Sequence, residues 1–220
     1  MDLEAVAHLE ELLRTIDRSD ESILKAAQDV AEDGMWVTTT TILMQSISDQ
    51  IIDLEGLLAQ PEIAYVNPSH ISLKGWLPGD NYYSTKDLSS WSEYLISYNK
   101  ILLALNEAGV PMMSGTDTPL PVLVPGFALH EELANMVDIG LSPYDALKTS
   151  TYNPAKYLGE LDEFGTVEVG KRADLVLLQA NPLEDITNTQ KIEGVMVRGK
   201  WYSRADLDTM LEEVAKANQK

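Results

Sequence analysis

The stretch Gly109-Val-Pro-Met-Met-Ser-Gly-Thr-Asp117-Thr-Pro119 decides how the rest of the chain is interpreted. Its apolar run, Val110 to Met113, is bounded by glycines and is typical of a short buried strand that leads to Asp117. In an α/β barrel, the loops at the C-terminal ends of parallel strands carry the chemistry. Asp117 is therefore a candidate metal ligand or proton carrier. The alternative is that Asp117 only caps a turn before Pro119.

A series of short motifs follows this stretch in a fixed order. They are Gly115-Thr-Asp, Pro125-Gly, Leu129-His-x-Glu-Leu, Gly140-Leu-Ser-Pro, Thr151-x-Asn-Pro-Ala, Gly165-x-Val-x-Val-Gly and Asn181-Pro-Leu-x-Asp. Together they resemble the C-terminal half of the metal-dependent amidohydrolase family, in the branch similar to imidazolonepropionase and the prolidases. The resemblance is strong from Gly109 to Leu211. It implies an α/β fold: the C-terminal part of a (β/α)8 TIM-type barrel, about its last two to three strand–helix units, with C-terminal strands of a small β-sandwich.

Composition narrows the possible partners. The 220 residues are fewer than the about 250 of a typical complete barrel. A net charge of −19 argues against a nucleic-acid partner, because phosphates would be repelled. The absence of cysteine excludes disulfides and thiolate metal sites. Apolar stretches are shorter than the ~18 residues of a membrane span, and the acidic start does not look like a signal peptide. We therefore expect no membrane partner and a cytoplasmic location, although the resemblance makes the start look internal.

Residues 3–16 have the apolar spacing of a helix, with glutamates on the other side. His8 lies just off the apolar stripe, which is typical of a histidine on a helix surface. The family resemblance gives another interpretation. A similar segment closes the sixth barrel strand there, and its histidine binds metal, so the resemblance makes His8 a candidate metal ligand.

A helix beginning at Ser19 or Asp20 and ending at Asp33-Gly34 precedes a predicted strand over residues 35–43. This strand is rich in β-branched residues, among them four consecutive threonines. It resembles the seventh barrel strand of the family, whose threonines face the pocket, and Thr39 is therefore a candidate substrate-binding residue. Threonines are also good strand formers without any binding role.

Residues 61–90 are irregular, with several prolines and glycines, and they are predicted to form one long loop. Their aromatic residues argue against disorder. We interpret the segment as a lid or wall over the substrate site, with Trp76 as a candidate substrate contact. An oligomer contact is the alternative. His70 also lies here, and nothing in the sequence marks it as a ligand.

Two further helices are predicted over residues 91–108 and 127–138. The second contains His130-Glu131, but position 134 is alanine, so the second histidine of a zinc-protease HExxH motif is missing. His130 is instead a candidate substrate contact near the pocket mouth, and a structural role in fixing the loop is the alternative.

Local capping signals explain much of the remaining pattern. Ser142-Pro143 and Asn153-Pro154 each predict the start of a helix. From Gly165 the apolar period changes to two, which predicts strands over 166–169, 173–178, 194–198 and 201–202, followed by a helix over 205–217. We expect three parts: a partial barrel over 1–160 with the loop at 61–90, sandwich strands over 161–204, and a C-terminal helix over 205–220.

The resemblance implies a metal-dependent hydrolase in which water attacks a C–N bond of an amide, cyclic amide or dipeptide. Asp117 would serve as general acid/base and metal ligand, and His8 as a second ligand. Imidazole and carboxylate ligands suit a divalent ion, with zinc as the default. The implied substrate is a small molecule, an amide or a peptide.

The chain departs from the pattern that the resemblance implies. That pattern also has a His-x-His pair on the first barrel strand, a ligand on the fourth, often a carboxylated lysine, and a histidine on the fifth, and none of these is here. The three histidines are His8, His70 and His130, and no two are separated by one residue. Half a barrel would also expose unpaired strand edges and apolar surface. We therefore expect a second chain or copy to complete the barrel. The alternative is a catalytically incomplete fragment or assembly subunit.

Overall fold

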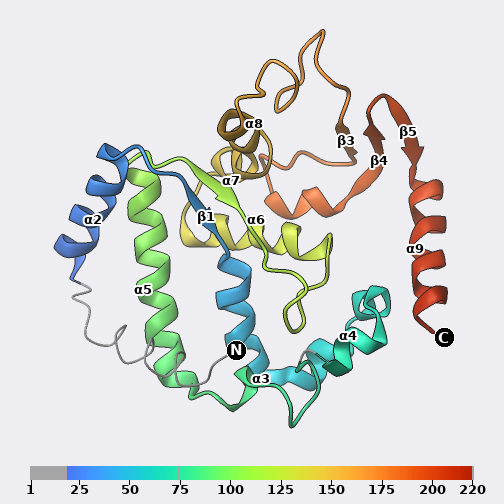
Figure 1. The fold of residues 1–220 in the computed structure, drawn as a ribbon, viewed down its shortest axis with the longest axis horizontal. Helices are drawn as coiled ribbons and strands as arrows, with labels where there is room; N and C mark the ends of the chain where they lie inside the picture. Colours follow the sequence, from blue (N-terminus) through green and yellow to red (C-terminus); the bar gives the residue numbers. More distant parts are fainter. Residues whose placement is uncertain (1–18, 74, 220) are drawn as a thin grey trace.

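The computed structural model describes residues 19–73 and 75–219, and the predicted helix over 3–16 with His8 lies outside them. The fold is α/β (Figure 1). In chain order its elements are α2 (Asp20–Glu32), β1 (Val37–Thr39), α3 (Thr41–Leu58), η1 (Pro61–Tyr65), α4 (Pro68–Leu73), η2 (Tyr83–Thr85), α5 (Leu88–Glu107), β2 (Met112–Ser114), α6 (Phe127–Ile139), α7 (Pro143–Ser150), α8 (Tyr152–Leu158), β3 (Leu175–Leu178), η3 (Ile186–Gln190), β4 (Ile192–Val197), β5 (Lys200–Ser203) and α9 (Arg204–Asn218).

Strands β1 and β2 form a parallel pair in which Val37 faces Met112 and Thr39 faces Ser114. The connection between them runs through α3, the insertion between α3 and α5, and α5 itself. Parallel strands require such a crossover, because a tight hairpin can join only antiparallel strands. The two strands therefore end at the same edge, and the segments after them, including the one that carries Asp117, begin side by side.

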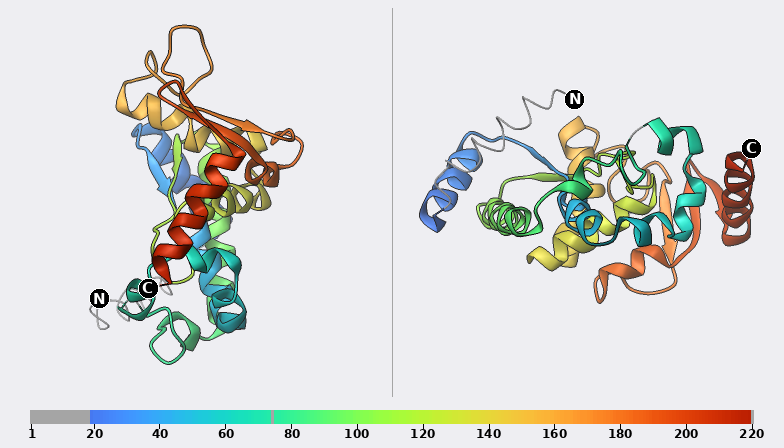
Figure 2. Two further views of the ribbon diagram at one scale, coloured as in Figure 1. Left: turned by 90° about the vertical axis from the view of Figure 1, so that its right-hand side faces the viewer. Right: turned by 90° about the horizontal axis from the view of Figure 1, so that it is seen from below.

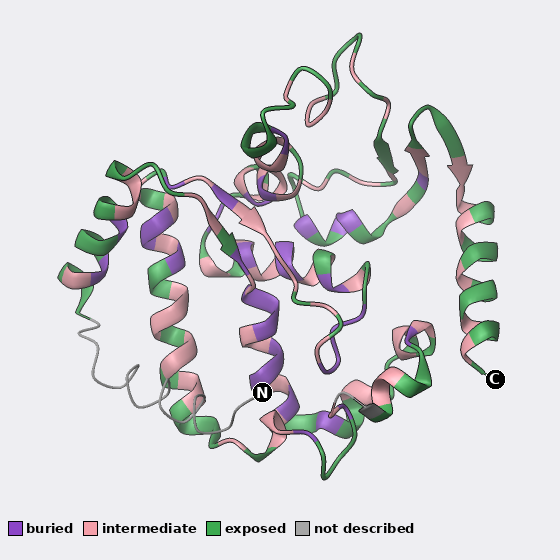
Figure 3. Ribbon diagram, in the orientation of Figure 1, coloured by how far each residue is buried: buried purple, intermediate pink, exposed green. Residues whose placement is uncertain are grey.

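The largest core cluster lies around this strand pair. Most of its buried members come from α2, α5, β2, α6 and α7, with Ile186 of η3, and they include Leu105, Met112 and Met136. A second cluster joins the first turns of α3 to Leu123 and Ala128, and a third joins the insertion to Val124. Figure 3 shows buried residues concentrated in α3 and α6 around the strands.

A separate antiparallel sheet has the order β3-β4-β5, and helix α9 packs on it. In Figure 2 this sheet and α9 lie to one side of the strand pair. The β4–β5 connection is a tight turn in which Arg198 and Gly199 both have positive φ, the conformation that two-residue hairpins prefer. The backbone N–H of Arg198 donates to Asp174 Oδ1 at 2.7 Å, which fixes the turn against the start of β3.

Several boundaries differ from the sequence-based prediction. The strand predicted over 35–43 is wrong beyond Thr39, because α3 begins at Thr41. The single long loop over 61–90 contains η1, α4 and η2, and α5 begins at Leu88 because Asp87 caps it by accepting the Ser90 N–H at 2.7 Å.

Two more predictions need correction. Residues 166–169 form no strand, since Val167 and Val169 lie in an exposed turn without a pairing partner in the described part of the chain. Asn153 does not cap α8, which begins one residue earlier, and its Nδ2 donates instead to the Met112 carbonyl at 2.7 Å. By contrast, the Ser142 cap of α7 is confirmed, because its Oγ accepts the Asp145 N–H at 3.1 Å.

Among the described helices, none combines the length and the apolar character needed to cross a membrane.

Candidate functional site at the end of the parallel strands

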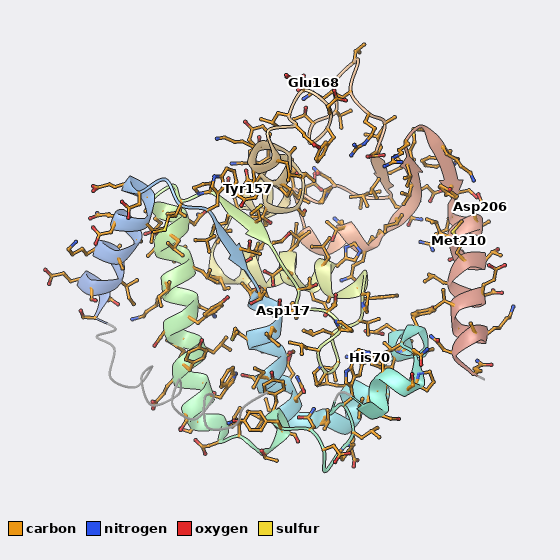
Figure 4. The ribbon with its side chains drawn as sticks, viewed as in Figure 1. His70, Asp117, Tyr157, Glu168, Asp206 and Met210 are labelled. Carbon is orange, nitrogen blue, oxygen red and sulfur yellow. The ribbon has the colours of Figure 1, made fainter. Side chains whose placement is uncertain are left out.

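Asp117 lies three residues beyond β2, at the edge where β1 also ends. It is exposed and has a left-handed backbone with φ of 51°. The approach to it is crowded: a Cβ at Gly115 would lie 2.7 Å from the Thr39 carbonyl oxygen, so only glycine fits at that position. Figure 4 shows Asp117 near the middle of the molecule, on the side toward α4 and His70 and away from the Glu168 turn.

The loop after Asp117 is held by hydrogen bonds from the insertion and α3. His70 Nε2 lies 3.0 Å from the Pro119 carbonyl oxygen. Buried Gln50 donates through Nε2 to the Pro121 carbonyl at 3.4 Å, and its Oε1 accepts from Asn81 Nδ2 at 2.8 Å. These contacts join three segments that are distant in sequence. They restrict where the Asp117 loop can move.

Trp76 anchors the insertion in the core. Its side chain is 0% exposed and belongs to the cluster that contains Val66 and Val124. Its ring also lies edge-on to His70, with centroids 6.2 Å apart. Among the described residues the indole is therefore a packing residue, and a role for Trp76 as a substrate contact stays a prediction. The insertion covers the Asp117 loop by packing on it.

The Thr39 side chain is also buried and hydrogen-bonded. Its side chain is 1% exposed, and its hydroxyl donates to Glu132 Oε1 at 2.7 Å. The Thr41 hydroxyl and the Ile42 N–H donate to Glu132 Oε2 at 2.6 and 2.7 Å. Thr39 thus has a structural partner, and its hydroxyl does not face an open pocket.

Glu132 is the residue that the sequence analysis missed. It is 0% exposed on α6, and burial raises the pKa of its carboxyl, although the hydrogen bonds from Thr41 and Thr39 act in the opposite direction. A signal was present in the sequence: Ala128, Glu132 and Met136 are spaced four residues apart on one helix face, so a charged residue interrupts an apolar stripe. A buried carboxyl on such a stripe needs partners, and here the β1–α3 junction supplies them.

Tyr83 of η2 shares a core cluster with the Asp117 loop. Its ring packs against the cluster of α3 residues that includes Ile42, together with Leu120 of the Asp117 loop. Burial raises the pKa of Tyr83, and the charges of Tyr82 and Asp117 raise it further. The insertion therefore places a phenol within electrostatic range of the strand-end aspartate.

His130 faces a different part of the molecule. Its Nδ1 lies 3.1 Å from Thr189 Oγ1 of η3, and burial lowers its pKa. The contact ties α6 to the segment before β4. This geometry favours the structural alternative, in which His130 fixes a neighbouring segment.

The described residues do not make a metal site by themselves. No group of three or more His, Asp or Glu side chains that could hold an ion occurs within residues 19–73 and 75–219. Asp117 is therefore the only one of the two predicted ligands that the structure places, and His8 lies outside the described part.

The sequence pattern of the Amidohydrolase family matches residues 5–202. The chain belongs to the amidohydrolase family. This amidohydrolase chain is 31% identical over 105 residues to an imidazolonepropionase of Shouchella clausii, a match that covers 44% of this chain and 22% of the relative. It is 34% identical over 95 residues to an adenine deaminase of Ligilactobacillus salivarius, covering 43% and 15%. The predicted family and its imidazolonepropionase-like branch are confirmed.

Solved structures show the same fold. The bottromycin amidohydrolase aligns with a TM-score of 0.65 at 23% identity, over 84% of this chain and 40% of that one. A prolidase complexed with N-methylphosphonate-L-proline aligns with a TM-score of 0.55 at 24% identity, over 82% and 38%. The amidohydrolase chain therefore spans less than half the length of these relatives.

Proposed function

We propose that the chain forms the C-terminal part of a metal-dependent hydrolase that cleaves a C–N bond in an amide, cyclic amide or dipeptide. The observation that carries the proposal is the place of Asp117, directly after β2, where the parallel strands end together. This edge is where barrel enzymes of many kinds hold their reacting groups. Family membership supports the reaction class.

Asp117 is the proton carrier in this proposal. Its exposed carboxylate accepts a proton from the attacking water as the new C–O bond forms, and it returns that proton to the nitrogen as the C–N bond breaks. The anchored loop after Asp117 limits its motion, which favours a fixed carboxylate position.

A divalent ion, zinc by default, is part of the proposal because the family resemblance implies it. The described residues alone do not fit such an ion, since Asp117 belongs to no group of three or more possible ligand side chains among them. His8 is the proposed second ligand, and the remaining donors would come from outside this chain. Such an ion, if bound, would supply Lewis acidity toward a water molecule and the substrate carbonyl.

The division of the chain is proposed on the same grounds. Residues 1–160 would contribute barrel units, 161–204 strands of a β-sandwich, and 205–220 a C-terminal helix. The two-stranded parallel pair has one free edge on each strand among the described residues, and a complete barrel would pair both. A second chain or copy that supplies the other strands is therefore the proposed partner.

The second candidate is a catalytically incomplete subunit that keeps fold and interface. The observation that favours it is the lack of an ion-binding group within the described residues. The two candidates differ in whether the purified chain binds a metal ion.

Elemental analysis of the purified chain after gel filtration separates the two. Near-stoichiometric zinc that is lost in Asp117→Asn, but kept in the exposed control Glu107→Gln, supports the hydrolase and should accompany hydrolysis of amides or dipeptides. Both substitutions remove one negative charge, so the control isolates position from charge. Metal-free protein of any assembled mass would overturn the first candidate for this chain and support the second.

A further inference from the structure

Glu132 is a fully buried acid for which the proposed function has no use. Its side chain extends from α6 and is 0% exposed. A carboxyl group loses its water on burial, and this loss is costly unless other groups replace the water. Met136, one turn further along the same helix, fills its place in the core with an apolar side chain. An acid at position 132 is therefore not explained by packing, and its role has to be sought in what it binds.

The Glu132 side chain accepts three hydrogen bonds from the junction of β1 and α3. Its Oε1 accepts from the Thr39 hydroxyl at 2.7 Å. Its Oε2 accepts from the Thr41 hydroxyl at 2.6 Å and from the Ile42 N–H at 2.7 Å. Three bonds to one planar group leave residues 39–42 little freedom to slide or rotate against α6. Glu132 therefore fixes the end of β1.

Thr39 extends this link to β2. Its hydroxyl oxygen also lies 3.3 Å from the carbonyl oxygen of Met113 on the neighbouring strand. The hydroxyl has one hydrogen, which it shares between Met113 and the nearer Glu132 oxygen. The carboxyl group thus holds the rotamer that turns the Thr39 hydroxyl toward β2. Without that acceptor, the hydroxyl could rotate away from β2 or donate to Met113 alone, and either change alters how the two strands meet.

The end of β2 has little room to absorb such a change. Gly115, the first residue after β2, lies so close to β1 that a Cβ there would be 2.7 Å from the Thr39 carbonyl oxygen and 3.0 Å from Thr38 Cγ2. Atoms packed this closely transmit a displacement instead of absorbing it. A shift of Thr39 therefore moves Gly115, and Asp117 follows two residues later.

We infer that Glu132 is a positioning residue for Asp117: through the Thr39 hydroxyl it sets where the end of β2 lies, and hence where the Asp117 carboxylate stands. Glu132 acts here through Thr39 and not by contact with a substrate. The inference rests on the proposed function, because the position of Asp117 matters for hydrolysis only if Asp117 is the proton carrier. The link from Glu132 to the end of β2 belongs to the fold, so it can be tested even in a chain without activity.

Amide NMR spectra of the 220-residue chain test this link at Gly115, Thr116 and Asp117. Glu132→Leu removes the acceptor, whereas Thr39→Val removes only the hydroxyl and leaves the bonds from α3 to Glu132 in place. We expect both variants to shift the three amide signals by more than their line widths. The double variant should add little to either single one, because both break the same link. Thr39→Ser keeps the hydroxyl and should restore the parent positions.

Met136→Ala separates positioning from a general loosening of α6. It lowers stability by opening the core and removes no bond to β1, so the three amide signals should keep their parent positions. Parent-like signals in both Glu132→Leu and Thr39→Val would overturn the inference, and so would equal shifts in Met136→Ala. If Glu132→Leu fails to fold, the contrast between Thr39→Val and Thr39→Ser decides, and the same signals in these two variants would overturn it.

Hydrolysis adds a readout that depends on the proposed function. With zinc added and L-alanyl-L-proline as the probe, kcat of Thr39→Val should fall by about 10- to 100-fold with KM unchanged, since a misplaced group affects the reacting state more than substrate binding. A parent chain without activity would count against the proposed function, and the NMR comparison alone would then decide the inference. Shifted amide signals with an unchanged kcat, in an active parent, would overturn the positioning role.

Discussion

Helices α6 and α9 are both amphipathic, yet they differ sharply in burial. Helix α6 has four buried residues, whereas α9 has none. The contrast extends to their sheets: Met112 of β2 is buried, but Leu175, Val176 and Leu177 of β3 are exposed. In Figure 3 the region around α6 contains the buried segments, and α9 shows only intermediate and exposed ones. Apolar pattern alone therefore does not produce a core; a neighbour on the apolar face is also needed.

Substitutions should destabilise the region of β1, β2 and α6 more than the region of β3 and α9. Replacement of Glu132 by leucine would leave the Thr39 and Thr41 hydroxyls and the Ile42 N–H without their acceptor. We expect the free energy of unfolding to fall by about 3 kcal/mol or more. Glu132→Gln keeps an acceptor oxygen and should cost clearly less. Urea denaturation of both variants measures the difference, and equal losses would show that the hydrogen bonds to Glu132 contribute little.

The second prediction compares one truncation in each region. Met136 is 1% exposed and Leu177 is 52% exposed. Met136→Ala should lower the free energy of unfolding by about 2–5 kcal/mol, because it leaves a cavity in a packed core. Leu177→Ala should change it several-fold less. Similar losses of unfolding free energy in the two variants would mean that β3 is covered in solution, for instance by a second chain or copy. The two regions would then not differ in burial.

Loss of the N-terminal cap of α9 should have a smaller effect on stability. Ser203 and Asp206 form a capping box, in which Ser203 Oγ accepts the Asp206 N–H at 3.3 Å and Asp206 Oδ2 accepts the Ser203 N–H at 2.8 Å. Ser203→Ala should reduce stability by about 1 kcal/mol. Because α9 has little burial to hold it, far-UV circular dichroism should show helix loss before the main unfolding transition. A single transition unchanged in shape would contradict this order of unfolding.

The smallest expected effect is on how stability depends on pH. Burial raises the pKa of Glu132 above its usual 4.5 in the folded chain. The folded state therefore holds this proton more tightly than the unfolded state, and the associated stability is complete below pH 4.5 and is lost as pH rises through the folded-state pKa. Relative to Glu132→Gln, the parent chain should lose stability across that rise. Parallel pH profiles of the two proteins would instead show that Glu132 has an ordinary pKa when folded.

The sequence by itself determined the features that local chemistry fixes. The ordered motifs identified the family, and the predicted helix over 127–138 matches α6 to within one residue. Ser142 was assigned correctly as a cap because serine, proline and an acidic residue in the first turn act within one helix turn. Such signals need no distant partner, so they can be read from the chain alone.

Only the tertiary structure decided where β1 ends and α3 begins. The β-branched residues from Thr39 to Ile42 favour a strand locally, and the N-cap residue Thr40 makes no side-chain capping bond. The Glu132 carboxyl, about ninety residues away, accepts the Ile42 N–H in the first turn of α3 and the hydroxyls of Thr39 and Thr41, and it thereby caps the helix. The same holds for Trp76, whose burial depends on Val66 and Val124. A partner that arrives by folding can override local preference, because the hydrogen bonds and contacts it makes in a dry interior outweigh the small propensity of each residue.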